Sequence, residues 1–225
     1  MRPAALLYPR KCPFCRALVE ETAWLCRDCE QELPWTGASG KTSGSFFSLC
    51  WSPLWYRGRA REALLRFKFS RRSAYAPSFG HLMAAQLREK LKTMPDTITY
   101  VPLSLPRLWR RGYSQSRLLA RAVASELGLP LERLLRKRAH RPAQSGIRDA
   151  AARRANVSGA FAPCRGAVIQ GKTVLLIDDV ITSGATLSEC SRVLLTAGAE
   201  RVLCATLCKA GKGPINSQRN GVWTV

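Results

Sequence analysis

Uninterrupted aliphatic runs and helix-spaced apolar residues alternate toward the C-terminal end of the chain. Residues Thr173 to Ile177 are β-branched or aliphatic throughout, which is typical of a strand buried on both faces of a parallel sheet. Apolar residues then recur at helical spacing from Leu187 to Ala197, and Gly198 ends that pattern. Residues 201–208 supply the next apolar run. This order predicts a strand–helix–strand unit.

The middle of the chain also contains both patterns, helix-spaced apolar residues and a short strand-like apolar run. Residues 57–72 carry an apolar stripe at helical spacing, and residues 79–92 continue as a second amphipathic helix. Ile98 to Leu103 reads as a strand, and Ser116 to Leu127 as a helix closed by a glycine. Between those two comes a basic, glycine-containing loop. The alternation predicts an α/β fold, a parallel sheet flanked by helices.

Local composition predicts the domain boundaries of the chain. We expect residues 1–35 to form a four-cysteine zinc finger and residues 36–56, rich in glycine, serine and threonine, to form a linker. Residues 57–208 would be the main domain, and residues 209–225 a disordered tail. Within the main domain, residues 133–154 are strongly basic without an apolar stripe, which predicts a basic surface loop.

Four cysteines near the N-terminus form two C-x-x-C pairs separated by ten residues: Cys12 with Cys15, and Cys26 with Cys29. Each pair can turn two thiolates toward one metal, and two pairs complete a tetrahedral zinc site. Zinc binding would then supply most of the folding free energy of this small knot. The alternatives are a redox dithiol or chance spacing, but neither pair has the βαβ context of a redox motif.

Composition adds a strong positive charge. The chain has 225 residues, with 36 Lys and Arg against 15 Asp and Glu, a formal net charge of +21. Such an excess favours nucleic acid or phosphorylated ligands as partners, although a merely solvated basic surface is the plain alternative. Aromatic residues near the basic segments could stack on bases, or simply pack in the core; they are Trp51, Trp55, Tyr56 and Trp109.

No targeting segment or membrane span is apparent in the sequence. The N-terminal apolar run is too short for a signal peptide, and no stretch approaches the roughly 18 apolar residues of a membrane span. We therefore expect a cytoplasmic protein, in which unpaired cysteines are ordinary packing or surface residues.

The most informative segment is the predicted strand-to-helix turn DDVITSGAT, residues 178–186. Free backbone amides at such a turn, with the helix N-terminus behind them, can hold a phosphate. The two carboxylates, Asp178 and Asp179, cannot bind that phosphate, but they suit hydroxyl groups or a Mg²⁺ ion. A ligand with both a phosphate and a vicinal diol is a ribose 5-phosphate. The expected phosphate-binding residues are Thr182, Ser183, Gly184, Ala185 and Thr186.

This segment closely resembles the phosphoribosyl diphosphate (PRPP) motif of type I phosphoribosyltransferases. The resemblance implies that the acidic pair binds the ribose 2′ and 3′ hydroxyls and that the turn holds the 5′-phosphate of PRPP. More of the chain, from about Leu7 to Leu207, resembles the ComF family. The segments that resemble the family are LYPRKCPFC, RFKFSRRS, the VPL that precedes RRGYSQS, and RRANVSGAF. Members of that family join a zinc finger to a phosphoribosyltransferase-like domain and are linked to natural competence.

The ComF resemblance implies catalytic roles for Arg111, Gln144 and Arg153, with Mg²⁺ bridging the ribose and the pyrophosphate. One departure stands in the loop expected to face pyrophosphate: the usual R-G-F-N-Q is here Arg111-Gly-Tyr-Ser-Gln115. Replacing the asparagine by serine shortens a hydrogen-bonding side chain, so turnover of PRPP stays open.

Two functions remain at this point. The first is a PRPP-binding ComF protein that handles single-stranded DNA in DNA uptake, with uptake-machinery proteins as further partners. The second is a soluble phosphoribosyltransferase that acts on a base or small amine, unrelated to DNA.

Overall fold

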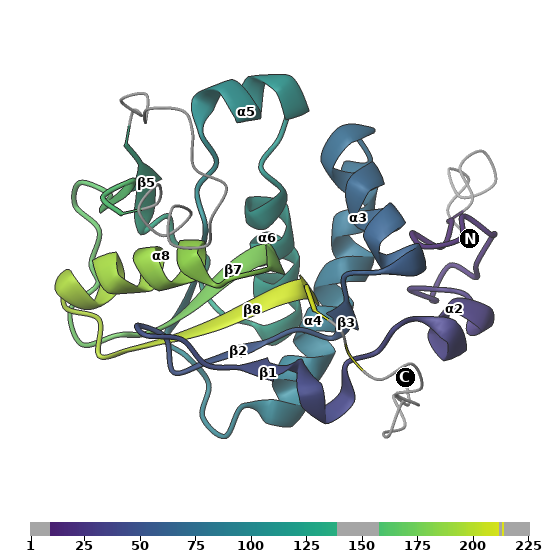
Figure 1. Cartoon of the computed structure of the whole chain (residues 1–225), viewed down its shortest axis with the longest axis horizontal. Helices are drawn as coiled ribbons and strands as arrows, with labels where there is room; N and C mark the ends of the chain where they lie inside the picture. Colours follow the sequence, from purple (N-terminus) through teal and green to yellow (C-terminus); the bar gives the residue numbers. More distant parts are fainter. Residues whose placement is uncertain (1–9, 139–157, 212, 214–225) are drawn as a thin grey trace.

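The structure is a computed structural model, and it describes residues 10–138, 158–211 and 213. Its main sheet has the strand order β1-β2-β8-β7-β4, with β3 paired to the end of β8 (Figure 1). All pairs are parallel except β1 with β2, and a separate antiparallel pair joins β5 to β6. The strands are β1 (Lys41–Thr42), β2 (Leu49–Trp51), β3 (Leu54–Trp55), β4 (Thr97–Tyr100), β5 (Leu135–Lys137), β6 (Phe161–Pro163), β7 (Thr173–Ile181) and β8 (Arg201–Lys209).

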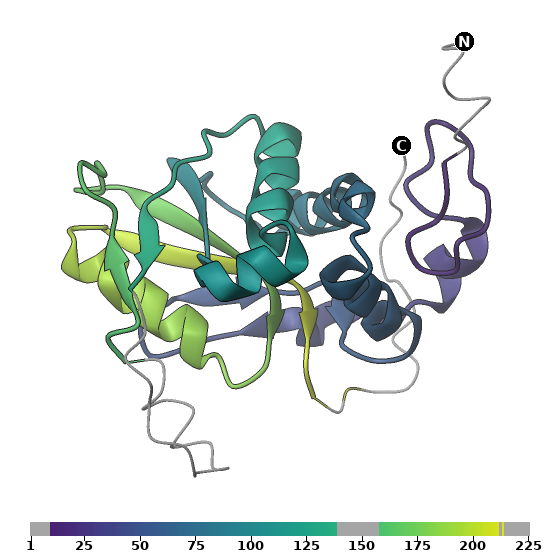
Figure 2. The same cartoon turned by 90° about the horizontal axis from the view of Figure 1, so that it is seen from above.

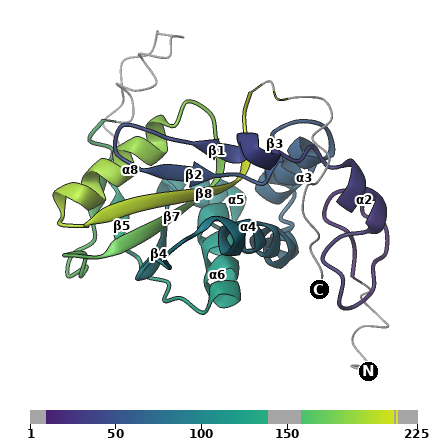
Figure 3. The same ribbon diagram turned by 90° about the horizontal axis from the view of Figure 1, so that it is seen from below.

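Helices cover both faces of this sheet. Figures 1 and 3 show α8 on one face and α4 and α6 on the other. The helices are α2 (Arg27–Glu32), α3 (Gly58–Phe69), α4 (Ala76–Lys90), α5 (Leu105–Arg111), α6 (Gln115–Leu127) and α8 (Ala185–Thr196). In the part of the chain that the structure describes, none of them combines the length and the apolar character needed to cross a membrane.

The alternation of side chains along β7 explains the two layers. Leu175 and Ile177 belong to the apolar cluster shared with α4 and α6, whereas Val174 and Leu176 belong to the cluster shared with α8. Successive residues of a strand point to opposite faces, so a strand between two helical layers must be apolar at every position. The prediction of an α/β fold with a mainly parallel sheet is confirmed.

Three segments differ from their sequence prediction. The predicted basic surface loop 133–154 begins with strand β5 (Leu135–Lys137), and its residues from 139 on lie outside the described residues. The predicted basic loop before α6 contains the two-turn helix α5, which ends at Gly112 in the left-handed conformation (φ 78°). The segment 36–56, predicted as a linker, instead supplies β1, β2 and β3, and two of these strands pair with β8. Their partner lies about 150 residues away along the chain, and local composition carries no signal of such a pairing.

The N-terminal cysteine segment packs against the main domain rather than standing apart. It lies at one end of the molecule beside α3 (Figure 2). The rings of Phe14 and Phe79 are 5.5 Å apart, and Arg66 donates to the carbonyl oxygens of Pro13 and Phe14 at 3.2 and 2.5 Å. Cys12, Phe14 and the α4 residues share one apolar cluster. The two parts therefore have a common core.

We predict that Phe47→Ala destabilises the protein strongly, because this side chain is 3% exposed in the cluster beneath α8. Emptying such a site costs about 3 kcal/mol, whereas a residue of a true linker would cost little. Phe46→Ala is the matched control, since Phe46 is 42% exposed and its loss should cost under about 1 kcal/mol. Urea unfolding measures both. Equal effects would contradict the assignment of this segment to the sheet.

Candidate functional site

The adjacent carboxylates lie at the carboxyl end of β7, within the strand rather than after it. β7 is held between β4 and β8, and Asp178 lies opposite Thr206 in the register. The amide of Val101 donates to the carbonyl oxygen of Ile177 at 3.0 Å, which fixes the neighbouring strand end. Ligands of open α/β sheets bind at this edge.

Asp179 forms a buried ion pair with the end of α3. Its Oδ1 lies 2.7 Å from Nζ of Lys68, and the two side chains are only 11% and 12% exposed. Removing either partner of such a pair leaves an uncompensated charge. Sequence reasoning did not single out Lys68. The signal was available, because Lys68 follows Leu64 by four residues and therefore lies on the apolar side of α3.

Asp178 has a different environment. The residue is half-buried, and its Oδ1 accepts a hydrogen bond from the backbone amide of Asp179 at 2.8 Å. Burial, and then repulsion by Asp179, raises the pKa of Asp178 to about 7, while the charges of Lys68 and Arg111 act in the opposite direction. A ligand that donates hydrogen bonds or positive charge here would stabilise the ionised carboxylate.

Arg111 brings a second cation toward the acidic pair. Its Nη1 donates to Oε1 of Gln115 at 3.0 Å, and its guanidinium lies 5.1 Å from the ring centre of Phe69. Burial lowers the pKa of Arg111, and the charge of Asp179 opposes that shift. Arg111 Nε and Gln115 Nε2 are both buried without a hydrogen-bond partner among the described residues. These two atoms lie at the end of α5 and the start of α6, and a ligand bound between them and the acidic pair would give them acceptors.

The turn after β7 presents the start of α8. Gly184 is the N-cap, with φ of 75°, a backbone conformation that favours glycine. The first amides of a helix have no partner within the helix, so the turn can hold an anion. Thr182 and Ser183 are exposed, and Gly184, Ala185 and Thr186 are half-buried. The turn is therefore accessible to a ligand, and the assignment of these five residues to phosphate stays a prediction.

The residues predicted to be catalytic are only partly described. Arg111 lies at the end of α5, close enough to Asp179 for the two charges to interact. Gln144 and Arg153 lie outside the described residues. Lys137, which was not predicted, also interacts with the charge of Asp178, and burial lowers its pKa. The described part of the site thus combines two carboxylates with Lys68, Arg111 and Lys137.

The four aromatic residues near the basic segments differ in exposure. Tyr56 is half-buried, with its ring centre 6.0 Å from Cζ of Arg61. Trp51 and Trp55 are 6% and 5% exposed, so they pack in the core. Trp109 on α5 is 84% exposed, and its neighbours Arg107 and Arg110 are exposed as well. Figure 1 shows α5 projecting beyond the sheet on the side where β7 leads into α8. The basic helix α5, with the exposed indole ring of Trp109, therefore lies near the acidic pair.

The four N-terminal cysteines form one cluster. The Sγ atoms of Cys12, Cys15, Cys26 and Cys29 all lie within 4.8 Å of one another. A tetrahedral zinc site with Zn–S bonds of about 2.3 Å brings its sulfurs to about 3.8 Å, so the cluster fits this metal. Burial, and then the charge of Cys12, raises the pKa of the Cys29 thiol. Four ionised thiols thus require a cation, which zinc supplies.

Comparison with protein families agrees with both parts of the molecule. The family model described as Phosphoribosyl transferase domain matches residues 114–222. The model described as Double zinc ribbon domain matches residues 4–55. The ribbon match and the cysteine cluster together support structural zinc.

Three relatives resemble longer parts of the chain. Competence protein F of Haemophilus influenzae is 30% identical over 211 residues, which cover 83% of this chain and 90% of the relative. Competence protein ComFC of Streptococcus pneumoniae is 27% identical over 198 residues, 88% of this chain and 80% of the relative. DNA utilization protein YhgH of Escherichia coli O157:H7 is 33% identical over 148 residues; the match spans 64% of each chain.

We predict that Cys12→Ser releases zinc, because the mutant cluster retains only three thiolates. Elemental analysis of protein purified without chelator should find about one zinc per chain in the wild type and much less in the variant. Cys164→Ser is the matched control, since Cys164 is half-buried and lies outside the cluster. Zinc that persists in Cys12→Ser, or disappears from both variants, would contradict the assignment.

The two aspartates should respond oppositely to removal of charge at pH 8. The folded-state pKa of Asp178 is raised, so the stability it contributes is present below its ordinary value of 3.8 and is lost as pH rises through about 7. Asp178→Asn should therefore increase the free energy of unfolding by about 1–2 kcal/mol at pH 8, with no gain near pH 4.

Asp179→Asn should instead lower the free energy of unfolding by about 3 kcal/mol at pH 8, because it leaves buried Lys68 unpaired. Thermal and urea unfolding of both variants at the two pH values measure these effects. Effects of the same sign at pH 8 would show that the carboxylates do not have the separate environments described above.

Proposed function

This chain belongs to the ComF family, and from that premise we propose that it binds PRPP at the Asp178–Asp179 turn and handles single-stranded DNA during natural competence. Its likeness to Competence protein F and the phosphoribosyltransferase match support a competence-associated, phosphoribosyltransferase-like protein. The name of its relative YhgH, a DNA utilization protein, supports DNA as a partner. The observation that carries the PRPP assignment is the acidic pair at the carboxyl end of β7 beside an accessible turn that begins helix α8.

Each part of PRPP has a chemically suitable partner. The 5′-phosphate would bind the turn amides and the hydroxyls of Thr182 and Ser183. The ribose 2′ and 3′ hydroxyls would donate hydrogen bonds to Asp178 and Asp179. Hydrogen bonds to the ionised carboxylate would lower the pKa of Asp178. When Mg²⁺ is bound with PRPP, it supplies positive charge to the pyrophosphate. Arg111, near Asp179, would hold the pyrophosphate from the side of α5.

These contacts define what the protein would contribute to a transfer reaction. Departure of pyrophosphate leaves positive charge at C1′ of the ribose, and the ionised carboxylates beside the ring would stabilise that charge. Arg111 would stabilise the leaving pyrophosphate. A small-molecule transferase unrelated to DNA is the second candidate, since the described site retains both carboxylates and a cation. PRPP-dependent release of pyrophosphate with one defined nucleobase would favour it.

The DNA assignment rests on charge and on α5. The net charge of +21 provides a long-range attraction for polyanions. Trp109 is 84% exposed, and an exposed indole can stack on any base. Arg107 and Arg110 on the same helix would contact phosphates. We therefore expect binding that depends steeply on salt and little on base sequence.

PRPP with Mg²⁺ should raise the melting temperature of the wild type, because a ligand that binds only the native state stabilises it. The double variant Asp178→Asn with Asp179→Asn should lose that shift. Gly184→Val should lose it too, since a β-branched residue cannot readily keep φ at 75°. Glu200→Gln, an exposed carboxylate before β8, is the control and should keep the shift. A full PRPP shift in the double variant would place the PRPP site elsewhere.

Trp109→Ala should weaken binding of single-stranded DNA about tenfold, since one base–aromatic stack contributes about 1–3 kcal/mol. Leu105→Ala is the matched control, because Leu105 is 70% exposed on the same helix and has no ring. Replacing Arg107 and Arg110 by Ala should reduce the slope of log K against log salt by about 1.4. Anisotropy titrations with unrelated oligonucleotides measure both effects. Equal losses in the Trp109 and Leu105 variants would contradict stacking.

A further inference from the structure

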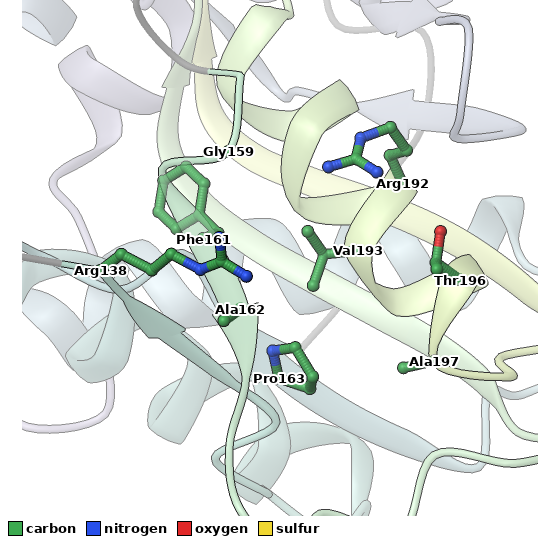
Figure 4. Close-up of a pocket in the computed structure, with 9 residues that line it drawn as sticks. All are labelled: Arg138, Gly159, Phe161, Ala162, Pro163, Arg192, Val193, Thr196 and Ala197. Carbon is green, nitrogen blue, oxygen red and sulfur yellow. The ribbon is translucent and has the colours of Figure 1, made fainter.

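A cavity of about 200 Å³ lies between β6 and the second half of α8, apart from the acidic pair (Figure 4). Phe161 and Ala162 from β6 and Val193 from α8 line it and are at least 93% buried. Thr196, an exposed residue at the end of α8, lines its edge. The cavity therefore has an apolar floor and opens beside a helix end.

Two arginines border this apolar floor. Figure 4 shows the guanidinium groups of Arg138 and Arg192 reaching toward the space between β6 and α8 from opposite sides. The backbone amide of Arg138 donates to the carbonyl oxygen of Ala160 at 2.9 Å, which anchors the end of β5 against β6. This bond fixes the backbone of Arg138 at the end of the small β5–β6 sheet, while its side chain is exposed.

The local charges are not balanced. Nε and Nη2 of Arg192 donate to the two carboxylate oxygens of Glu189, each at 2.8 Å. Oε1 of Glu189 also accepts from the amide of Gly159 at 2.7 Å, and these hydrogen bonds help lower the pKa of Glu189. Glu189 also interacts with the charge of Arg138, which is exposed. Among the described residues at this cavity, two arginines therefore share one carboxylate, which leaves a net charge of +1.

Size and charge together indicate the class of ligand. The volume is below the roughly 300–1,000 Å³ of pockets for drug-sized ligands, which limits the occupant to a small metabolite. A planar carboxylate matches the paired donors of a guanidinium better than a point-like anion does. The buried floor requires an apolar body next to that anionic group.

We propose that this cavity is a second ligand site, which binds a small carboxylate with an apolar body. The carboxylate lies against Arg138, with Arg192 and the hydroxyl of Thr196 beside it, and the apolar body rests on Phe161 and Val193. The site is separate from the turn that starts α8, because Val193 is eight residues and about 12 Å along the helix from Ala185. The proposal does not depend on PRPP binding.

Benzoate is a suitable probe, because it joins a planar carboxylate to an apolar ring. Saturation-transfer NMR on the full-length, zinc-loaded protein should show benzoate binding, with much weaker binding of neutral benzamide and of inorganic phosphate. Arg138→Ala should weaken benzoate binding about tenfold, the effect of losing a charged hydrogen-bonding partner. Thr196→Phe should abolish it by filling the cavity from its exposed edge, without a change in the buried floor.

Two controls make the test decisive. Arg136→Ala removes an equal charge from an exposed position of the same strand, outside the cavity lining, and should leave benzoate binding unchanged. The double variant of Asp178 and Asp179 should also retain it, which separates this site from the proposed PRPP site. Equal binding of benzoate and benzamide, an unchanged affinity in Arg138→Ala, or equal losses in Arg136→Ala and Arg138→Ala would overturn the proposal.

Discussion

The carboxylates of Asp178 and Asp179 share one end of a strand that is buried between two helical layers, so each needs a cation or a proton. Asp179 has the ammonium group of Lys68 at 2.7 Å. Asp178 is left with burial and repulsion, which raise its pKa to about 7. The native state therefore keeps an unfavourable charge that a ribose diol could stabilise through hydrogen bonds. This arrangement costs stability in the absence of ligand, which is typical of a binding site.

Helix α3 connects that site to the zinc ribbon. Near its end Lys68 pairs with Asp179, and two residues earlier Arg66 donates to the carbonyl groups of the first C-x-x-C turn. Near its beginning, Arg59 forms an ion pair with Glu32 at 2.7 Å and lies 3.8 Å from Sγ of Cys29. The ribbon and the acidic pair therefore constrain the same helix, and the shared core around Phe14 and Phe79 keeps it in place.

Local periodicity was enough to predict β7 and α8 at the site, but it missed the short helix α5, which was predicted as a loop. It also could not predict strand pairing between segments far apart in the chain. The unbroken aliphatic run of β7, the helical spacing of α8 and the glycine after it are all visible in the sequence, as is the paired spacing of the four cysteines. Residues 41–55 join the sheet because β2 and β3 pair with β8, which lies about 150 residues further along the chain. Lys68 was missed for a similar reason, since its partner Asp179 is 111 residues away and charge alone does not identify a buried lysine among many surface ones.

A crystal structure of the zinc-loaded protein with PRPP and Mg²⁺ tests the central claim most directly. We expect the 5′-phosphate within hydrogen-bonding distance of the amides of residues 182–186, and the ribose hydroxyls within that distance of Asp178 and Asp179. The Lys68–Asp179 ion pair should remain or lengthen to admit the ribose. PRPP bound elsewhere, with the acidic pair making no contact to the sugar, would contradict the account.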